Sequence, residues 1–400
     1  MGDGEEINER RETKRMELDF DNLRALRVLG RGAMGTVFLV ADAEPFALKV
    51  YDKRSPTARR PDAERRARWE LTVLSRLRHP LLPTLLGSVE TPDFIAWAIP
   101  FYPGGDLNAL RHSLPDRSLS TAALRFYLSE LVSALAHLHS LNIAFRDLKP
   151  ENVLLRADGH IVLSDFDLSR QLSPAPLQHF VEHLADLRSG HPPSRPRHRR
   201  HLTRIWFPGR GLAAGVKKTR SARVSPARAG ERANSFVGTE EYVAPEIVRA
   251  EGHDFAVDWW ALGILAYEMA YGRTPFKGRN RKETFRNVLA RDPEFPGGSA
   301  RRRRTDLEDL IARLLEKDPA QRLGAGGGAG EVRAHSFFKG VQWDLVTEVS
   351  RPPFLFEDET EAVIGPGGDQ TGLETFDVRD YFTKLRQETV TALSVSLDEF

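Results

Sequence analysis

The sequence predicts an α+β fold, with strands in the first part of the chain and helices in the larger remainder. Three stretches carry this prediction. Leu23–Val40 has the pattern of a strand, a glycine turn and a second strand. Leucines recur at helical spacing after Ser120, a residue type favoured at helix N-caps. Ala256–Tyr271 is apolar except for Asp258 and Glu268, as expected for a buried helix.

The composition is typical of a soluble globular protein, with 40% hydrophobic and 28% charged residues in a chain of 400. No apolar run is long enough to span a bilayer, and the charged stretch 1–15 lacks the apolar core of a signal peptide. The chain contains no cysteine, which excludes disulfides and thiolate metal sites. These features favour the cytoplasm and the nucleus.

The glycine turn reads Gly30-Arg-Gly32-Ala-Met-Gly35, and a run rich in β-branched and aromatic residues follows at 36–40. A lone Gly-x-Gly-x-x-Gly is weak evidence, because dinucleotide-binding folds use one as well. In those folds the glycines open a helix, whereas this run favours a strand. The pattern therefore favours a hairpin whose backbone can approach the phosphates of a nucleotide, with an ordinary glycine hairpin as the alternative.

The next strand, Phe46–Val50, carries Lys49. A lysine in a strand is usually a solvated edge residue, but beside the glycine hairpin it becomes a candidate for binding phosphate. Its acidic partner is expected in a helix over 62–78, where Glu70 shares one face with two leucines. Glu64 competes for this role, but it precedes the apolar stripe among arginines, which favours a surface position.

Residues 145 to 152 read Phe-Arg-Asp-Leu-Lys-Pro-Glu-Asn. Their spacing matches the catalytic loop of eukaryotic protein kinases, His-Arg-Asp-Leu-x-x-x-x-Asn. With these motifs the chain resembles serine/threonine kinases of the AGC group, in the plant branch (AGC VIII), and within it the UNICORN-type kinases. The resemblance covers about residues 20–338 apart from an insertion. It implies the bilobal protein kinase fold and transfer of the γ-phosphate of ATP to Ser or Thr.

The resemblance gives each motif a role. Asp147 would orient the substrate hydroxyl and accept its proton, and Lys149 would neutralise the γ-phosphoryl group. Lys49 would hold the α- and β-phosphates while paired with Glu70. Lys149 also implies specificity for Ser/Thr rather than Tyr. The further ATP-binding positions that the resemblance implies are Leu29, Gly30, Arg31, Gly32, Ala33, Met34, Gly35, Thr36, Val37, Ala47, Pro100, Tyr102 and Leu154.

The cofactor implied is Mg²⁺, held by Asn152 and Asp165. Two positions depart from the general kinase pattern. Phe145 stands where His is commonest, and its ring can fill the same packing slot. Asp167 replaces the Gly of Asp-Phe-Gly, which lowers backbone freedom but leaves the metal ligand Asp165 unchanged. Asp-Phe-Asp is also what the plant AGC branch carries.

An insertion at 171–234 separates this triplet from Ala-Pro-Glu at 244–246. It holds thirteen Lys or Arg against three Asp or Glu, so it carries the basic character of a chain whose net charge is only +2. Apolar residues are too sparse to order it, and we expect it to be mostly disordered. Importins, anionic lipid or nucleic acid are candidate partners, with nuclear import favoured and a solvated linker that binds nothing as the alternative.

Ser235 precedes Phe-Val-Gly-Thr and resembles the activation-loop site that a phosphoinositide-dependent kinase phosphorylates in AGC kinases. A phosphate there would pair with Arg146 and order the loop. A solvated serine is the alternative. Glu246 and Arg322 would form the ion pair that anchors the activation segment.

Asp106, Glu151 and Glu268 fall where basophilic AGC kinases place carboxylates that bind substrate arginines, and each of them could instead be a surface acid. We therefore expect protein substrates with Arg upstream of the phosphorylated Ser or Thr. Asp258 would accept hydrogen bonds from the catalytic-loop backbone, because a buried carboxylate must be satisfied.

The expected organisation is a disordered terminus over 1–19, a small lobe over 20–99, a large lobe over 100–338 and an irregular tail over 339–400. Within the tail, 376–382 loosely resembles the AGC segment that returns to the ATP cleft. Phe400 ends a sequence that resembles the terminal Phe-x-x-Phe docking motif, but Leu397 replaces its first Phe.

Two other function classes compete with an active, monomeric kinase. A pseudokinase scaffold would act through the basic insertion. Against it, the four residues expected to bind phosphate and metal are all present: Lys49, Asp147, Asn152 and Asp165. A nucleic-acid-binding protein would need a base-reading module, and only disordered basic residues are available. A peripheral position at the plasma membrane is the alternative localisation.

Overall fold

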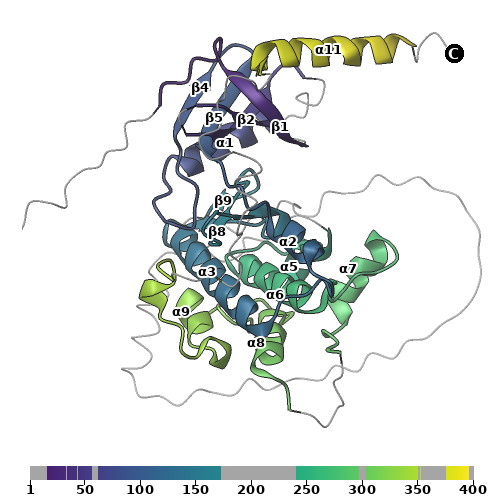
Figure 1. The fold of residues 1–400 in the computed structure, drawn as a ribbon. Coiled ribbons are helices and arrows are strands. Elements are labelled where there is room, and N and C mark those ends of the chain that lie inside the picture. The colour runs from purple at the N-terminus through teal and green to yellow at the C-terminus, as the bar shows by residue number, and fades with distance from the viewer. Residues whose placement is uncertain are drawn as a thin grey trace, which may run out of the picture. The chain divides into compact units, whose positions relative to one another are not determined.

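The computed structural model describes residues 16–32, 34–42, 44–55, 62–172, 240–296, 303–349, 352 and 375–395 (Figure 1). Ala33, Ser235 and Phe400 lie outside these residues, as does nearly all of the basic insertion. The expectations for those positions therefore have no structural counterpart here.

The small lobe is built on a six-stranded antiparallel sheet in the order β10-β1-β2-β3-β5-β4. The strands are β1 Arg24–Gly32, β2 Gly35–Val40, β3 Phe46–Asp52, β4 Gly87–Glu90, β5 Phe94–Pro100 and β10 Phe376–Asp377, and the helix α1 spans Ala63–Leu74. The expected strand–turn–strand and the expected helix are both present.

Strand register decides which side chains of β2 and β3 enter the core of the small lobe and which face the cleft described below. Phe38 pairs with Leu48 and Val37 pairs with Lys49 across β2 and β3. Successive side chains of a strand point to opposite faces, so the fully buried Phe38 and Leu48 enter the lobe's apolar core while Val37 and Lys49 face the other way. This alternation places Lys49 in the cleft.

Both ends of the described chain pack on the small lobe. The Met16 N–H donates to the Leu86 carbonyl at 2.7 Å, and Phe20 stacks on Phe94 with ring centroids 4.6 Å apart. Residues 16–19 thus belong to the lobe, whose boundary we expected at residue 20, because Leu18 and Phe20 are buried there.

The tail, which we expected to be irregular, contains a strand and a helix. β10 pairs with β1, and the helix α11, Val378–Val395, follows it on the same lobe (Figure 1). Phe382, which is 2% exposed, packs edge-on against Phe38 and lies over Phe94. Burial of these rings explains why a segment far along the sequence joins the small-lobe sheet.

The large lobe is mainly helical. Its helices are α2 Leu107–Ser113, α3 Thr121–Ser140, α5 Pro245–Val248, α6 Ala256–Tyr271, α7 Arg281–Ala290, α8 Asp306–Leu314 and α9 Gly328–Arg333. It also contains two short strand pairs, β6 Ile143–Ala144 with β9 Arg170–Gln171 and β7 Val153–Leu155 with β8 Ile161–Leu163. The segments between these strands carry the candidate site residues Asp147, Lys149, Asn152 and Asp165.

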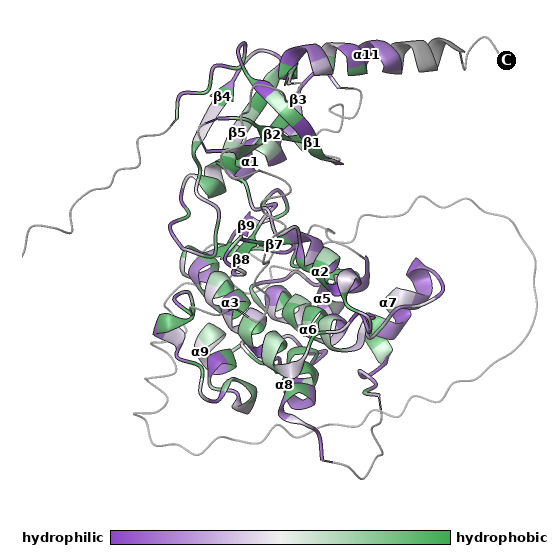
Figure 2. Ribbon diagram, in the orientation of Figure 1, coloured by the Kyte–Doolittle hydropathy of each residue, from purple (hydrophilic) through white to green (hydrophobic). Residues whose placement is uncertain are grey.

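Helix α6 forms the centre of this lobe. It coincides with the expected apolar helix, and its Trp259 and Trp260 are completely buried. In Figure 2 its colouring is more hydrophobic than that of α7. Ser120 caps α3 as expected, its hydroxyl accepting from the Ala123 N–H at 3.2 Å. Among the described helices, none combines the length and apolar character needed to cross a membrane.

Candidate active site

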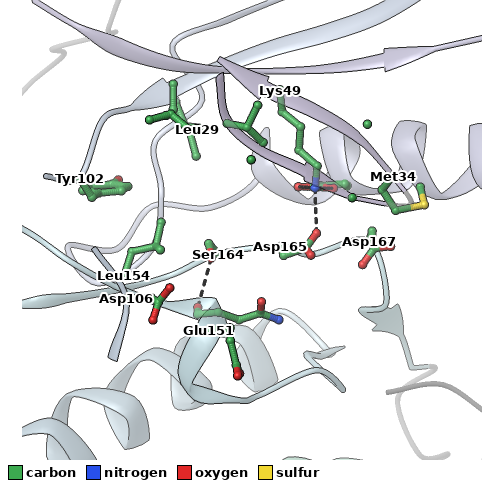
Figure 3. Close-up of a pocket in the computed structure, with 18 of the residues that line it drawn as sticks. Leu29, Met34, Lys49, Tyr102, Asp106, Glu151, Leu154, Ser164, Asp165 and Asp167 are labelled. Carbon is green, nitrogen blue, oxygen red and sulfur yellow. Dashed lines mark hydrogen bonds and ion pairs between the residues drawn. The ribbon is translucent and has the colours of Figure 1, made fainter. Parts of the chain in front are cut away.

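A cleft of about 1180 Å³ is lined by the glycine hairpin, by the segment after β5 and by the loops around β7 and β8 (Figure 3). Leu29 of β1 and Leu154 of β7 line it from opposite sides, and Tyr102 lines one end. The expected ATP-binding residues line this cleft, with two exceptions. Thr36 is buried within β2 and is not part of the lining, and Ala33 is outside the described residues.

Gly35 is required by the hairpin itself. Its φ is +128°, and a Cβ at this position would lie 2.3 Å from the Val50 carbonyl oxygen. By contrast, a Cβ at Gly32 would meet no atom within 4 Å. The close approach of β2 to β3 therefore depends on the third glycine of the motif.

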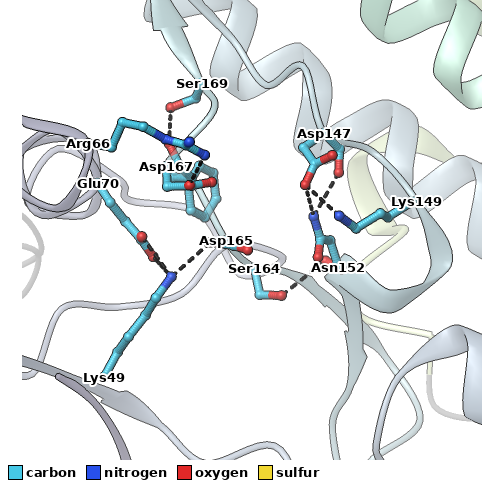
Figure 4. Close-up of polar contacts among 11 residues, drawn as sticks. Lys49, Arg66, Glu70, Asp147, Lys149, Asn152, Ser164, Asp165, Asp167 and Ser169 are labelled. Atoms are coloured by element: carbon cyan, nitrogen blue, oxygen red, sulfur yellow. Dashed lines mark hydrogen bonds and ion pairs between the residues drawn. The ribbon is translucent and has the colours of Figure 1, made fainter. Parts of the chain in front are cut away.

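Lys49 links both lobes. Its Nζ lies 3.0 and 2.8 Å from the two carboxylate oxygens of Glu70 and 2.8 Å from Asp165 Oδ1 (Figure 4). Glu64, the competing candidate, instead forms a surface ion pair with Arg68. The ammonium group thus lies between a helix of the small lobe and the loop that follows β8.

Burial and neighbouring charges shift the pKa values of Lys49 and Glu70 in opposite directions. Burial alone would lower the pKa of Lys49, but Asp165 and then Glu70 outweigh it and raise that pKa above its ordinary value, so Lys49 stays charged. Burial raises the pKa of Glu70 to about 7, although Lys49 offsets part of the effect. Lys49 therefore keeps its positive charge between the two carboxylates.

The loop over residues 145–152 is tied together by short hydrogen bonds. Lys149 Nζ donates to Asp147 Oδ2 at 2.7 Å, and Asn152 Nδ2 donates to the same oxygen and to the Asp147 carbonyl, both at 2.8 Å. Burial raises the pKa of Asp147, and Lys149 offsets part of this rise. A carboxylate, a cation and an amide therefore converge on one side of the cleft (Figure 4).

One residue of this loop and one of the segment after β8 have an unusual backbone conformation. Arg146 has φ +69°, and Asp165 has φ +65°, values that residues other than glycine rarely adopt. The completely buried Asp258 accepts from the N–H groups of Phe145 at 2.9 Å and Arg146 at 2.7 Å. These bonds satisfy the buried carboxylate and help to hold the loop in this conformation. The Phe145 ring lies edge-on to Phe166, with centroids 5.2 Å apart.

Asn152 and Asp165 offer oxygen ligands suited to Mg²⁺. Asn152 uses its amide nitrogen to donate to Asp147, which leaves its amide oxygen as an acceptor. The Asp165 side chain is 38% exposed to the cleft. Within the described residues no group of three or more acidic or histidine side chains could hold a metal by itself. This donor set fits Mg²⁺, which commonly takes one or two protein oxygens together with substrate phosphates.

Glu246 and Arg322 form a buried bidentate ion pair. Arg322 Nη1 and Nη2 donate to the two carboxylate oxygens at 2.7 and 2.9 Å, and both side chains are at most 2% exposed. Arg322 also donates to the backbone carbonyls of Ala256 and Glu316. This pair joins the start of α5 to the loop before α9.

The three candidate carboxylates for substrate arginines differ in their surroundings. Asp106 and Glu151 line the cleft, and Asp106 also caps α2 by accepting from the Ala109 N–H. Glu268 lies 3.3 Å from the Arg111 guanidinium and accepts from the Tyr242 hydroxyl at 2.6 Å, so it already has an internal cation.

Several lining residues were not expected from the sequence. Trp97 lies under the Lys49 ammonium group, 5.6 Å from Nζ to the ring centroid. The Ser164 hydroxyl donates to the Asn152 carbonyl at 3.2 Å. Arg66 forms an ion pair with Asp167. The position of Ser164 immediately before the Asp-Phe-Asp triplet could have indicated its place, whereas the partner of Arg66 depends on tertiary packing.

Comparison with known proteins agrees with this geometry. The protein kinase domain family matches residues 23–184 and 211–338. The chain is 49% identical over 390 residues to serine/threonine-protein kinase UCNL of Arabidopsis thaliana, covering 92% of this chain and 90% of that protein. It is 49% identical over 389 residues to serine/threonine-protein kinase UCN of the same plant, covering 92% of this chain and 91% of that protein. It is 44% identical over 350 residues to serine/threonine-protein kinase OXI1, also of that plant, covering 84% of this chain and 80% of that protein.

Proposed function

Because the chain belongs to the protein kinase family, we propose that it is an active Mg-ATP-dependent kinase that phosphorylates Ser and Thr next to basic residues. The sequence expectations of a serine/threonine kinase and of the plant AGC branch with UNICORN-type relatives are confirmed by the relatives. The observation that carries activity is the contact of Lys49 with both Glu70 and Asp165, which brings together groups from both lobes.

In the proposed reaction, Lys49 binds the α- and β-phosphates, and the glycine hairpin covers them with backbone amides. Asp147 holds the substrate hydroxyl in line with the γ-phosphorus and accepts its proton. The bond from the hydroxyl oxygen to phosphorus forms as the bond to the ADP oxygen breaks, while Lys149 balances charge on the transferred group. Bound Mg²⁺, held through Asn152 and Asp165, would neutralise charge on the phosphate oxygens.

A pseudokinase scaffold is the competing proposal. Incubation of the full chain with γ-labelled ATP distinguishes the two, with Lys49→Glu as the control. The proposal requires label on the protein itself or on a basic acceptor peptide for the wild type, and none for Lys49→Glu. Loss of Asp147 should lower the rate by roughly 10²- to 10⁴-fold, the usual range for positioned acid–base groups.

Substrate choice is proposed to rest on Asp106 and Glu151. Both line the cleft, and Glu151 is exposed, so an arginine of a bound peptide can reach them. Glu268, paired with Arg111, would contribute only by exchanging partners. A peptide library should select Arg upstream of the phosphorylated residue; a profile without this preference contradicts the proposal.

Phosphorylation of Ser235 by a phosphoinositide-dependent-like kinase is the proposed activating step. Arg146 supports it, because it precedes Asp147 directly and lies in a basic, poorly solvated surrounding, where burial and then the nearby Arg170 lower its pKa to about 10. Such a surrounding favours an added phosphate. Ser235→Ala should sharply lower activity towards peptides. Full activity in that variant rules the switch out.

The basic insertion is proposed to direct the protein to the nucleus as well as the cytoplasm, with anionic lipid at the plasma membrane as the alternative. Deletion of 171–234 tests this directly. An unchanged cellular distribution contradicts a targeting role.

A further inference from the structure

Asp167 occupies the position where most protein kinases carry glycine, and its side chain is only 4% exposed. Its carboxylate forms an ion pair with the Arg66 guanidinium of α1, which is 32% exposed (Figure 4). Asp165, the candidate metal ligand, lies two residues away. A glycine here would have no side chain with which to contact α1.

The ion pair is one of three links between α1 and the segment 165–169. Arg66, Trp69 and Glu70 share one face of the helix, because residues three and four apart are neighbours. Trp69 Nε1 donates to the Ser169 hydroxyl at 3.0 Å, and Glu70 reaches Asp165 through Lys49. All three links are made by side chains within the described residues, and none of them uses the segment 173–239.

We propose that Arg66 and Asp167 are positioning residues for Mg-nucleotide binding. Their ion pair fixes α1 against the metal-binding triplet and so aligns Asp165 and Lys49 with the phosphates. The inference rests on the proposed function, because it assigns the pair to the nucleotide site of an active kinase. It also gives the aspartate in place of glycine a role that differs from that of Ser235, whose phosphate would act on peptide binding.

The two partners should respond unequally to mutation. Removing Arg66 leaves the buried Asp167 carboxylate without its cation and next to Asp165, an arrangement that repels and distorts the triplet. Removing Asp167 leaves an arginine that is one-third exposed and can turn towards water. Arg66→Met should therefore be worse than Asp167→Gly, and adding Asp167→Gly to Arg66→Met should partly restore binding.

The experiment measures Mg-ADP affinity of the full chain by calorimetric titration, with ADP plus EDTA as the metal-free arm. We expect Arg66→Met to weaken Mg-ADP binding by about 10- to 100-fold, the scale of a buried group that loses its partner. The double variant should regain at least about fivefold, and Arg66→Lys should lie near the wild type. Metal-free ADP binding should change less, which a purely structural loss would not produce.

Arg65→Met is the matched control, because Arg65 lies on the same helix, is 77% exposed and forms its ion pair with a residue that is exposed as well, Asp62. Its affinity should equal that of the wild type. If Arg66→Met does not fold, Arg66→Gln with and without Asp167→Gly takes its place under the same criterion.

Unchanged Mg-ADP affinity in a folded Arg66 variant, or a double variant no better than the single one, overturns the inference. If the wild type meanwhile transfers phosphate, the proposed function stands and only the positioning role is lost. A wild type that binds no Mg-nucleotide overturns both.

Discussion

Replacing Arg322 with methionine tests how much the buried ion pair of Arg322 with Glu246 stabilises the fold. Arg322 makes four hydrogen bonds, two to Glu246 and one each to the carbonyls of Ala256 and Glu316, and its side chain is completely buried. In Arg322→Met the Glu246 carboxylate stays buried at 2% exposure without a cation. Removing one partner of a buried pair typically costs about 3–5 kcal/mol.

For a domain of this size, a loss of that magnitude should lower the unfolding midpoint by roughly 10 °C. Adding Glu246→Met removes the stranded charge and should recover most of the loss, since apolar replacement of a whole buried pair is often neutral. Arg65→Met, which breaks a surface pair, should cost less than about 1 kcal/mol.

The assay is thermal unfolding of the three variants followed by circular dichroism. A midpoint for Arg322→Met within about 2 °C of the wild type, or a double variant less stable than the single one, refutes the reasoning.

The remaining predictions concern the tail, the glycine hairpin and pH. Phe382→Ala should destabilise the protein by about 3–5 kcal/mol, because its ring is 2% exposed; a denaturation midpoint like that of the wild type contradicts the packing of α11. Gly35→Ala should weaken ATP binding by at least about tenfold through its clash with β3 and its positive φ, whereas Gly32→Ala should change it little; equal effects in nucleotide titrations contradict the hairpin geometry. Burial and then Arg146 lower the pKa of His253 to about 4, so the unfolded chain binds a proton first on acidification. The stability that neutral His253 provides is present above about pH 6.5 and lost below it, and His253→Gln should reduce the fall in unfolding midpoint between pH 7.5 and 5.5; an identical fall in both proteins contradicts this.

The motifs of the site could be predicted from the sequence because each depends on local spacing. The strand alternation around Lys49, the helical stripe with Glu70 and the octapeptide of the catalytic loop are set by residues close together in the chain. The helix Ala256–Tyr271 was predicted with the bounds that the structure has, since a run so apolar has no alternative to burial.

Contacts between distant segments could not be predicted in the same way. The pairing of β10 with β1 joins Phe376 to Ala25, and no local pattern specifies that partner. The loose resemblance of 376–382 to the AGC tail segment suggested a return to the ATP cleft but not the sheet edge that the segment joins. The ion pair of Arg66 with Asp167 likewise follows from how α1 packs. The sequence showed that Asp167 stands in place of glycine, but it did not show which residue Asp167 contacts.

Glu268 illustrates a further limit of predicting a site from the sequence. Its position suggested a carboxylate for substrate arginines, yet in the fold it contacts Arg111 and Tyr242. A sequence motif places a charge but does not reveal which internal partner already neutralises it.

Transfer of labelled γ-phosphate by the purified full chain tests the central claim most directly. The wild type should label itself or a peptide with upstream arginines, and Lys49→Glu should not. No incorporation by the wild type into itself or into any of the offered basic peptides, under conditions where Mg-ATP is bound, contradicts the account.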